Sequence, residues 1–431
     1  MNINDLVYER LLDRKPPGEW AIRPLNVLLP SGELAEGLDI VIDGDSIARV
    51  SDSGDSGVAD QEVLLWPQGT LMPGLIDAHA HLTFSADGDV VSNAIGDSTH
   101  MQVARALGNA QLALTKGVTT VVDCGARTEV ILAVRHASDS GLIASPTVLV
   151  SGAPITTTAG HCHWLGGAAD TTDEVIRLAR QLAQDGVDFV KVMLTGGNLT
   201  AGSNPKQLQY SESTIAALGA ECKRLGKPLF VHAHTENAVA LAAMSGATVI
   251  AHASCQDVDG RVALSASTVA ALKSAGTLVD ATITVGALDG HLGADMAVRR
   301  RHEQRTAMLP LFRRMHDAGV VILAGTDGGV PSVPHGEVAR AIAALHVEVG
   351  IPLGEALLSG TKRPAEAFGR SDRLGVIRPG ARADLLLLEG DVVEDVSAVL
   401  RPAHVWMRGK LVASEGCLVP GAPASVLASQ M

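Results

Sequence analysis

The sequence predicts an α/β protein, a (β/α)8 barrel with a small β-sandwich built from both ends of the chain. Between residues 73 and 372, eight short apolar segments alternate with amphipathic helical segments. Before and after this region the pattern is one of strands and turns. Hydrophobic residues make up 46% of the 431 residues and charged residues 19%, so the chain can bury a large core.

Four segments are expected in order along the chain. Residues 1–19 form an N-terminal arm whose charges among apolar residues are unlike a signal peptide. Residues 20–72 form the first part of the sandwich, with "AIRPLNVLLP", "GLDIVIDGDSIARV" and "EVLLWP" as strands. The barrel covers 73–372, and 373–431 add "LGVIRP", "ADLLLLEG" and "HVWMRGKLV". Each end alone is too small to hold a core, so we expect the two to pack together.

The barrel strands are expected to be short and mostly apolar, followed by helices with recognisable ends. Several helical segments, such as "TTDEVIRLARQLAQDG" and "ESTIAALGAECKRLG", begin near Ser, Thr or Asp and end in Gly. The eight predicted strands are "GLIDAHAHL", "VTTVVDC", "PTVLVSG", "VDFVKVML", "PLFVHAH", "TVIAHAS", "TLVDAT" and "VVILAGTD".

Charge and cysteine content exclude several classes of protein. With 34 basic and 47 acidic residues the net charge is −13, which argues against binding nucleic acid or an anionic membrane surface. No uncharged apolar run of membrane-spanning length occurs. The five cysteines form no CxxC pair, which favours a reduced, cytoplasmic protein. A homo-oligomer is expected, although no interface can be identified from the sequence.

Histidines and an aspartate stand at the ends of the predicted strands, where barrel enzymes carry their active residues. Alone, such a histidine is more often a satisfied polar residue than a ligand. Residues two apart on a strand share a face, so pairs of the HxH type can bind one metal ion. Imidazoles and a carboxylate suit Zn²⁺ and related ions. The residues that jointly predict a metal site are His79, His81, His232, His234, His252 and Asp327.

Lys191 stands in the middle of the fourth predicted strand, "VDFVKVML", among apolar neighbours. Taken alone, it can be a lysine that extends its amine to the surface or a partner of a buried carboxylate. Whether Lys191 has a structural or a functional role therefore depends on the other motifs in the sequence.

Five motifs in this order resemble the amidohydrolase superfamily: "PGLIDAHAHL", "VKVMLTGG", "FVHAHT", "VIAHAS" and "AGTDGG". The resemblance runs from about Trp20 to Val412 and includes "DRLGVIRPGARADLLLLEGD". Three loops, "SGAPITTTAGHCHWLGG", "TGGNLTAGS" and "TDGGVPSVPHGE", resemble a branch with two metal ions. That branch contains Xaa-Pro dipeptidases, Xaa-Arg carboxypeptidase-like enzymes and hydrolases of amides, carbamates and ureas. The resemblance implies a TIM barrel.

The resemblance also implies two divalent metal ions, with Zn²⁺ as the default. Lys191 would bind both, as a carbamate formed with CO₂, which requires the neutral amine that burial favours. One ion would be bound by His79, His81, Lys191 and Asp327, the other by Lys191, His232 and His252.

The implied reaction is hydrolysis of an amide-like C–N bond in a dipeptide, N-acyl amino acid, aryl amide, carbamate or urea. A metal-bridging hydroxide would attack, with Asp327 as general base, and His234 would contact the substrate or polarise its carbonyl. Arg299, Arg300 and Arg301 either offer a cation to a substrate carboxylate or form a solvated helix start. Other expected substrate contacts are His161, His163, Asn198 and His335.

Two alternatives remain. One is a mononuclear deaminase or cyclic-imidate hydrolase of the same fold, against which Lys191 argues. The other is a non-enzymatic binding protein, which would be expected to have lost a ligand; none of the expected ligands is missing from the sequence.

Overall fold

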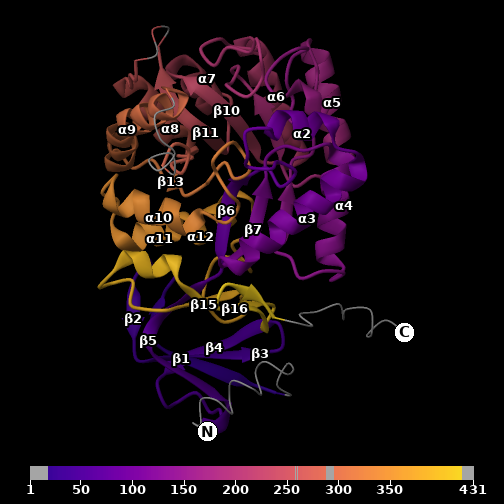
Figure 1. Cartoon of the computed structure of the whole chain (residues 1–431). Helices are drawn as coiled ribbons and strands as arrows, with labels where there is room; N and C mark the ends of the chain where they lie inside the picture. Colours follow the sequence, from indigo (N-terminus) through magenta and orange to yellow (C-terminus); the bar gives the residue numbers. More distant parts are fainter. Residues whose placement is uncertain (1–17, 258, 260, 288–295, 420–431) are drawn as a thin grey trace.

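The computed structural model describes residues 18–257, 259, 261–287 and 296–419, with helices above a sheet domain in the view of Figure 1. Of the predicted N-terminal arm, residues 1–17 lie outside the described residues. The first strand, β1 (Trp20–Leu28), begins where the sequence predicted the first part of the sandwich.

Both ends of the chain contribute to one nine-stranded sheet. Its order is β17-β16-β15-β14-β5-β1-β3-β4, with β2 paired to β1. The two ends meet where β5 pairs antiparallel with β14. The strands from the N-terminal end are β1, β2 (Leu34–Glu36), β3 (Leu38–Asp43), β4 (Ser46–Asp52) and β5 (Val63–Pro73). Those from the C-terminal end are β14 (Leu385–Leu388), β15 (Pro402–Met407), β16 (Lys410–Ser414) and β17 (Cys417–Leu418).

This sheet curls on itself. Three strand spacings separate β1 from β15, or about 14 Å in a flat sheet. The rings of Trp20 on β1 and Trp406 on β15 nevertheless lie with centroids 5.9 Å apart. Both rings belong to an apolar core shared with Ile40, Leu71 and Leu385. The pairing of β5 with β14 thus joins the strands of both chain ends into one continuous sheet domain with a shared core, and its description as a β-sandwich stays a prediction.

Eight parallel strands form the second part of the protein. The three-stranded sheet contains β6 (Leu75–Ala80), β7 (Val118–Asp123) and β8 (Thr147–Val150). The five-stranded sheet contains β9 (Val190–Met193), β10 (Leu229–Thr235), β11 (Val249–Gln256), β12 (Leu278–Asp280) and β13 (Ile322–Leu323). Single parallel bridges, between Ala80 and Gly328 and between Ile155 and Val192, connect the two sheets on both sides. The eight strands therefore follow one continuous circuit.

Helices follow these strands, and their ends obey local rules. The hydroxyls of Ser98, Ser211, Thr235 and Ser265 each accept a backbone N–H at a helix start, and Thr171 forms a capping box with Glu174. The 3-10 helices are η1 (Asp60–Glu62), η2 (His163–Leu165) and η4 (Val396–Leu400). The α-helices are α2 (Val90–Gly96), α3 (Thr99–Thr115), α4 (Thr128–Asp139), α5 (Thr172–Gln184), α6 (Glu212–Leu225), α7 (Glu236–Met244), α8 (Ala266–Ala275), α9 (Met296–Asp317), α10 (Val338–Val347), α11 (Leu353–Ser359) and α12 (Lys362–Ala367).

Phenylalanines pack together on the inner side of the parallel strands. The ring of Phe189 lies 5.9 Å from that of Phe230 and 5.0 Å from that of Phe368. Phe230 also contacts His79, with ring centroids 5.3 Å apart. This cluster forms an apolar floor beneath the residues described in the next section.

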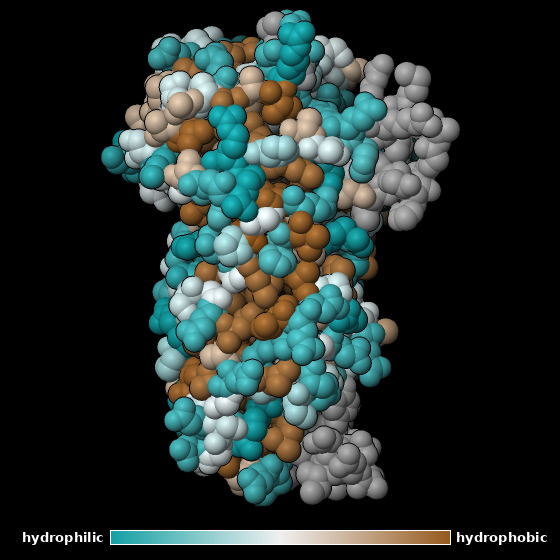
Figure 2. All heavy atoms as spheres, turned by 90° about the vertical axis from the view of Figure 1, so that its left-hand side faces the viewer, coloured by the Kyte–Doolittle hydropathy of each residue, from teal (hydrophilic) through white to brown (hydrophobic). Residues whose placement is uncertain are grey.

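Apolar side chains also reach the surface. In Figure 2, which views the left-hand side of Figure 1, they gather in a band at about the height of α10 and α11.

None of the helices in the described part of the chain combines the length and apolar character needed to cross a bilayer. The homo-oligomer stays a prediction.

Candidate active site

A cavity of about 300 Å³ opens at the carboxyl ends of the parallel strands. All six predicted metal ligands, Lys191 among them, line it together with His234. The remaining lining comes from β9 and β11, from loops after the strands and from α9. The polar and charged lining residues are His79, His81, His161, Lys191, Asn198, His232, His234, His252, Ser254, Thr282, Arg301, Gln304, Arg305 and Asp327.

The first group of side chains that could hold a metal ion comes from β6, from the residue after it and from the segment after β13. The Nε2 atoms of His79 and His81 lie 3.4 and 3.3 Å from Oδ1 of Asp327. One ligating atom from each of the three side chains lies within 4.8 Å of the others. Asp327 has a backbone φ of +59°, an uncommon conformation for a residue other than glycine. The first and last strands of the circuit thus meet at this group.

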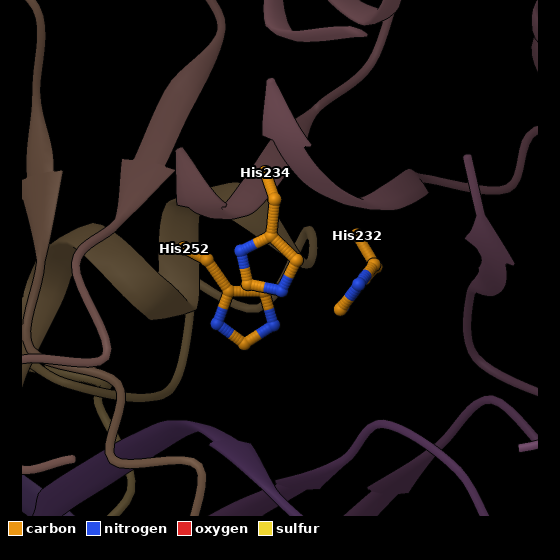
Figure 3. A group of neighbouring side chains, drawn as sticks. All are labelled: His232, His234 and His252. Atoms are coloured by element: carbon orange, nitrogen blue, oxygen red, sulfur yellow. The ribbon is translucent and has the colours of Figure 1, made fainter. Parts of the chain in front are cut away.

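The second group consists of His232, His234 and His252, from β10 and β11. Figure 3 shows their three rings gathered at one place. The rings of His234 and His252 are stacked with centroids 4.7 Å apart, and that of His232 stands edge-on to His234 at 4.5 Å. One ligating atom of each also lies within 4.8 Å of the others. His252 has a φ of +66°, so both groups contain a residue with a left-handed backbone.

Lys191 lies on β9 with only 1% of its surface exposed. Its Nζ atom has no hydrogen-bond partner among the described atoms and lies 4.0 Å from the ring centroid of Phe230. Burial lowers the pKa of this amine, because an ammonium is costly in an apolar site and the nearby Asp327 and Asp280 offset that cost only in part. An orphaned amine is therefore placed beside two sets of metal-ligating side chains.

Every histidine in the two groups has one ring nitrogen engaged by the protein. Such partners fix the orientation of a metal-binding imidazole and direct its other nitrogen to the ion. The donor set therefore fits divalent cations. The engaged pairs are His79 Nδ1 with Asp280 Oδ2 (2.7 Å), His81 Nδ1 with Gly125 O (3.1 Å), His232 Nε2 with Gly196 O (3.0 Å), His234 Nδ1 with Ser254 Oγ (2.8 Å) and His252 Nδ1 with Thr282 Oγ1 (3.1 Å).

Protonation states also suit ligation. Burial lowers the pKa of His234 to about 4, and it moves those of His232 and His252 in the same direction. These imidazoles are therefore neutral at pH 7. Burial opposes the ionisation of Asp327, but the adjacent His79 and His81 outweigh it and hold the pKa of this carboxyl below its usual range.

Asp280 was not identified from the sequence, although its side chain holds His79. It ends β12, is fully buried, and belongs to a strand that carries none of the predicted ligands. The signal was present, because "TLVDAT" places an acid at the end of an apolar strand. A buried carboxylate there requires a partner.

The predicted substrate contacts divide into two pairs. His161 and Asn198 line the cavity. His163 and His335 are not part of its described lining. The ring of His163 is hydrogen-bonded to Gly160 O at 2.9 Å, and that of His335 to Phe84 O at 3.2 Å.

Of the three arginines considered from the sequence, Arg301 lines the cavity. The side chains of Arg299 and Arg300 lie outside the described residues. Arg301 stands in the second turn of α9, so the cavity receives a cation from this helix.

Comparison with known proteins agrees with this geometry. The amidohydrolase family matches residues 70–412, and its members generally bind divalent metals. The chain is 27% identical to ochratoxinase of Aspergillus niger over 383 residues, 80% of this chain and 76% of that protein. It is 28% identical to imidazolonepropionase of Streptomyces avermitilis over 400 residues, 86% of each.

A solved structure of a Xaa-Pro dipeptidase with methionine bound in its active site resembles the fold. The TM-score is 0.81 at 25% identity, over 91% of this chain and 99% of that one. Such neighbours imply a TIM-barrel fold for the eight parallel strands. Because the family match covers most of its length, this protein belongs to the amidohydrolase family and is a hydrolase that acts on carbon–nitrogen bonds.

Proposed function

We propose that the protein hydrolyses an amide-like C–N bond in a small molecule, using two divalent metal ions in a closed (β/α)8 barrel. The substrate classes are those expected from the sequence, namely a dipeptide, N-acyl amino acid, aryl amide, carbamate or urea. The observation that carries the proposal is the convergence of two metal-ligating groups on one cavity that also contains the orphaned Nζ of Lys191.

The residues present fit two ions. His79, His81 and Asp327 would hold one, and His232 and His252 the other. Divalent cations such as Zn²⁺ supply an activated water and polarise a carbonyl when they are bound.

Lys191 would serve both ions as a carbamate. Its neutral amine forms an N–C bond with CO₂ and loses one proton, which gives an anion with two oxygen atoms. The low pKa of the buried amine supports this step, since only the unprotonated nitrogen reacts. The carbamate would replace the unpartnered amine of Lys191 by an anion that offers one oxygen atom to each of the two proposed metal ions.

Asp327 and His234 would handle the proton and the carbonyl. The ionised Asp327 accepts a proton from the attacking water and returns it to the leaving nitrogen. The Ser254 hydroxyl lies 2.8 Å from His234 Nδ1 and can donate to it, which leaves the Nε2–H of His234 to donate to the substrate carbonyl oxygen. His161 and Asn198 line the same cavity and are proposed to contact the substrate.

The test combines metal counting with a hydrolysis screen. Metal-loaded protein should contain two ions per chain and hydrolyse members of a panel of Xaa-Pro and Xaa-Arg dipeptides, N-acyl amino acids, anilides, carbamates and phenylureas. The variant Lys191→Met should lose metal and activity, whereas Lys273→Met, at an exposed position on α8, should retain both.

Two outcomes would contradict the proposal. One metal ion per chain together with activity only on amino-substituted heterocycles would favour the mononuclear deaminase. If the metal-loaded protein hydrolyses no compound on an extended panel of amides, the proposed hydrolysis of an amide-like bond is refuted. The non-enzymatic alternative is not retained, because the family and its relatives are enzymes.

A further inference from the structure

The side chain of Gln209 connects two loops of the active site. Gln209 lies after β9, in the loop that leads to α6. Its amide nitrogen donates to Met193 O at 2.6 Å and to Thr156 Oγ1 at 3.1 Å. Its amide oxygen accepts the backbone N–H of His161 at 2.7 Å. Met193 ends β9, the strand of Lys191, whereas Thr156 and His161 belong to the loop after β8. The amide therefore ties the loop after β8 to the end of β9.

The loop after β8 fits closely around this amide. A Cβ at Gly160 would overlap the amide oxygen of Gln209, so the loop can approach only because this position has no side chain. The next residue, His161, is 6% exposed, and its Nδ1 has no hydrogen-bond partner among the described atoms. The position of the His161 ring thus depends on packing and on the backbone that Gln209 holds.

The ring of His161 contacts both the loop after β9 and a proposed metal ligand. A Cβ at Gly197 would overlap this ring, so the ring rests directly on the Gly197 backbone. The centroids of the His161 and His232 rings are 4.9 Å apart, with planes at 35°. A displacement of His161 would therefore remove packing from the Gly197 backbone and from His232 together.

The same loop backbone orients His232. Its Nε2 lies 3.0 Å from Gly196 O. Because a carbonyl oxygen only accepts, Nε2 carries the proton and Nδ1 is the nitrogen left for a metal ion. In Figure 3 the ring of His232 stands to one side of the stacked rings of His234 and His252. The Gly196 carbonyl and the His161 ring are therefore two contacts that set where Nδ1 of His232 points.

We propose that Gln209 is a positioning residue of the active site. Through His161 it holds the backbone of Gly196 and Gly197, and with it His232, in the orientation that the second metal ion requires. The inference rests on the proposed function for the presence of this ion. The orientation of His232 itself is a property of the protein chain, so it can also be measured without metal.

The first test compares Gln209→Met with Gln207→Met. Methionine keeps the length of the side chain and removes all three amide hydrogen bonds, whereas Gln207 is an exposed residue of the same loop. The full-length protein is titrated with buffered Zn²⁺, and the phase of the second ion is the one that His252→Ala abolishes. Gln209→Met should weaken this phase by about tenfold, the lower end of the effect of losing an outer partner of a metal-binding histidine. Gln207→Met should leave both phases as in the wild type.

The variant Gly197→Ala reaches the same point without touching Gln209. Its methyl group would displace the His161 ring, and the backbone of Gly197 is not in the left-handed region, so it accepts alanine. The second phase should weaken by about tenfold here too. Because Gln209 keeps its three hydrogen bonds in this variant, the proposal stays testable if Gln209→Met does not fold. An unchanged second phase in Gly197→Ala, or in folded Gln209→Met, would overturn the proposal.

A cycle of single and double variants tests the route through His161. His161→Ala alone should weaken the second phase by about tenfold. If Gln209 acts through His161, adding Gln209→Met to His161→Ala should weaken the phase by less than about threefold more. Full multiplication of the two separate losses would contradict this route.

A measurement on the metal-free protein separates this inference from the proposed function. With isotope-labelled histidines, the Nε2–H of His232 that donates to Gly196 O should give a proton resonance protected from exchange, assigned by its loss in His232→Gln. The resonance should disappear in Gln209→Met and persist in Gln207→Met. If the protein binds fewer than two ions, the proposed function fails and this resonance decides the inference. Its persistence in Gln209→Met, or its absence from the wild type, would refute the positioning role.

Discussion

Replacing Asp280 by asparagine should weaken metal binding at the His79 group without unfolding the protein. The fully buried carboxylate lies 2.7 Å from His79 Nδ1 through Oδ2, and its Oδ1 accepts the backbone N–H of Thr282 at 3.2 Å. Asparagine keeps the size of the side chain but offers a neutral oxygen. The charge-assisted bond that orients His79 then becomes an ordinary one.

The expected loss follows from the role of such partners. Removal of a group that orients a metal-binding histidine lowers metal affinity by about tenfold to a hundredfold. This corresponds to about 1.4 to 2.7 kcal/mol. The matched control is Thr282→Val, since Thr282 Oγ1 is 3.1 Å from Nδ1 of His252 in the other group. A neutral hydroxyl is involved there, so the expected loss is smaller, about 0.5 to 1.5 kcal/mol.

The assay is metal content at equilibrium with buffered free Zn²⁺. Two occupancy phases are expected, and Asp280→Asn should shift one and Thr282→Val the other. Gly325→Ala should act like Asp280→Asn, because a Cβ at this glycine would meet the Asp280 carboxylate. Unchanged occupancy in Asp280→Asn, with an unchanged melting temperature, would refute the role given to Asp280.

Three further predictions concern other groups. Asp327→Asn should lower kcat by at least about a hundredfold in folded protein, measured on any substrate found, and near-wild-type turnover would exclude this residue as the base. In metal-free protein, Lys191→Met should raise the free energy of unfolding by about 1 to 3 kcal/mol in urea titrations, because it removes the unpartnered buried Nζ; a loss of stability would contradict this. Burial lowers the pKa of His404 to about 4, so the unfolded state binds more protons than the folded state between about pH 6.5 and 4, and stability falls as the pH falls. At pH 5 the cost is about 2 kcal/mol, which His404→Gln should remove while the exposed His136→Gln does not.

The positions of the proposed ligands could be predicted because they depend on local rules. His79 lies on β6 and His81 follows the last residue of that strand, whereas His232 and His234 both lie on β10; the members of each pair are two apart and share a face. Parallel strands place their carboxyl ends at one rim, which brings distant motifs to a single cavity. The same placement at the carboxyl end of a parallel strand positions Lys191, although its strand β9 has only four residues.

The same rule fails in loops. His161 and His163 are also two apart, but Cys162 between them has a φ of +55° and η2 begins at His163. The chain therefore turns, so that His161 lines the cavity while the ring of His163 bonds to Gly160 O. Alternation along the sequence carries no information about such a turn.

The walls of the cavity depend on long-range packing. Arg305 anchors α9, since its guanidinium donates to Ile283 O at 2.8 Å and to both carboxylate oxygens of Glu348. This anchor connects α9 to the loop after β12 and to the end of α10, and it places Met308 and Phe312 beside the proposed metal ligands. The helical pattern of the sequence indicates an inward face but not what that face covers. Short strand motifs thus position the proposed metal ligands, whereas the docking of one helix shapes a wall of the cavity and cannot be inferred from those motifs.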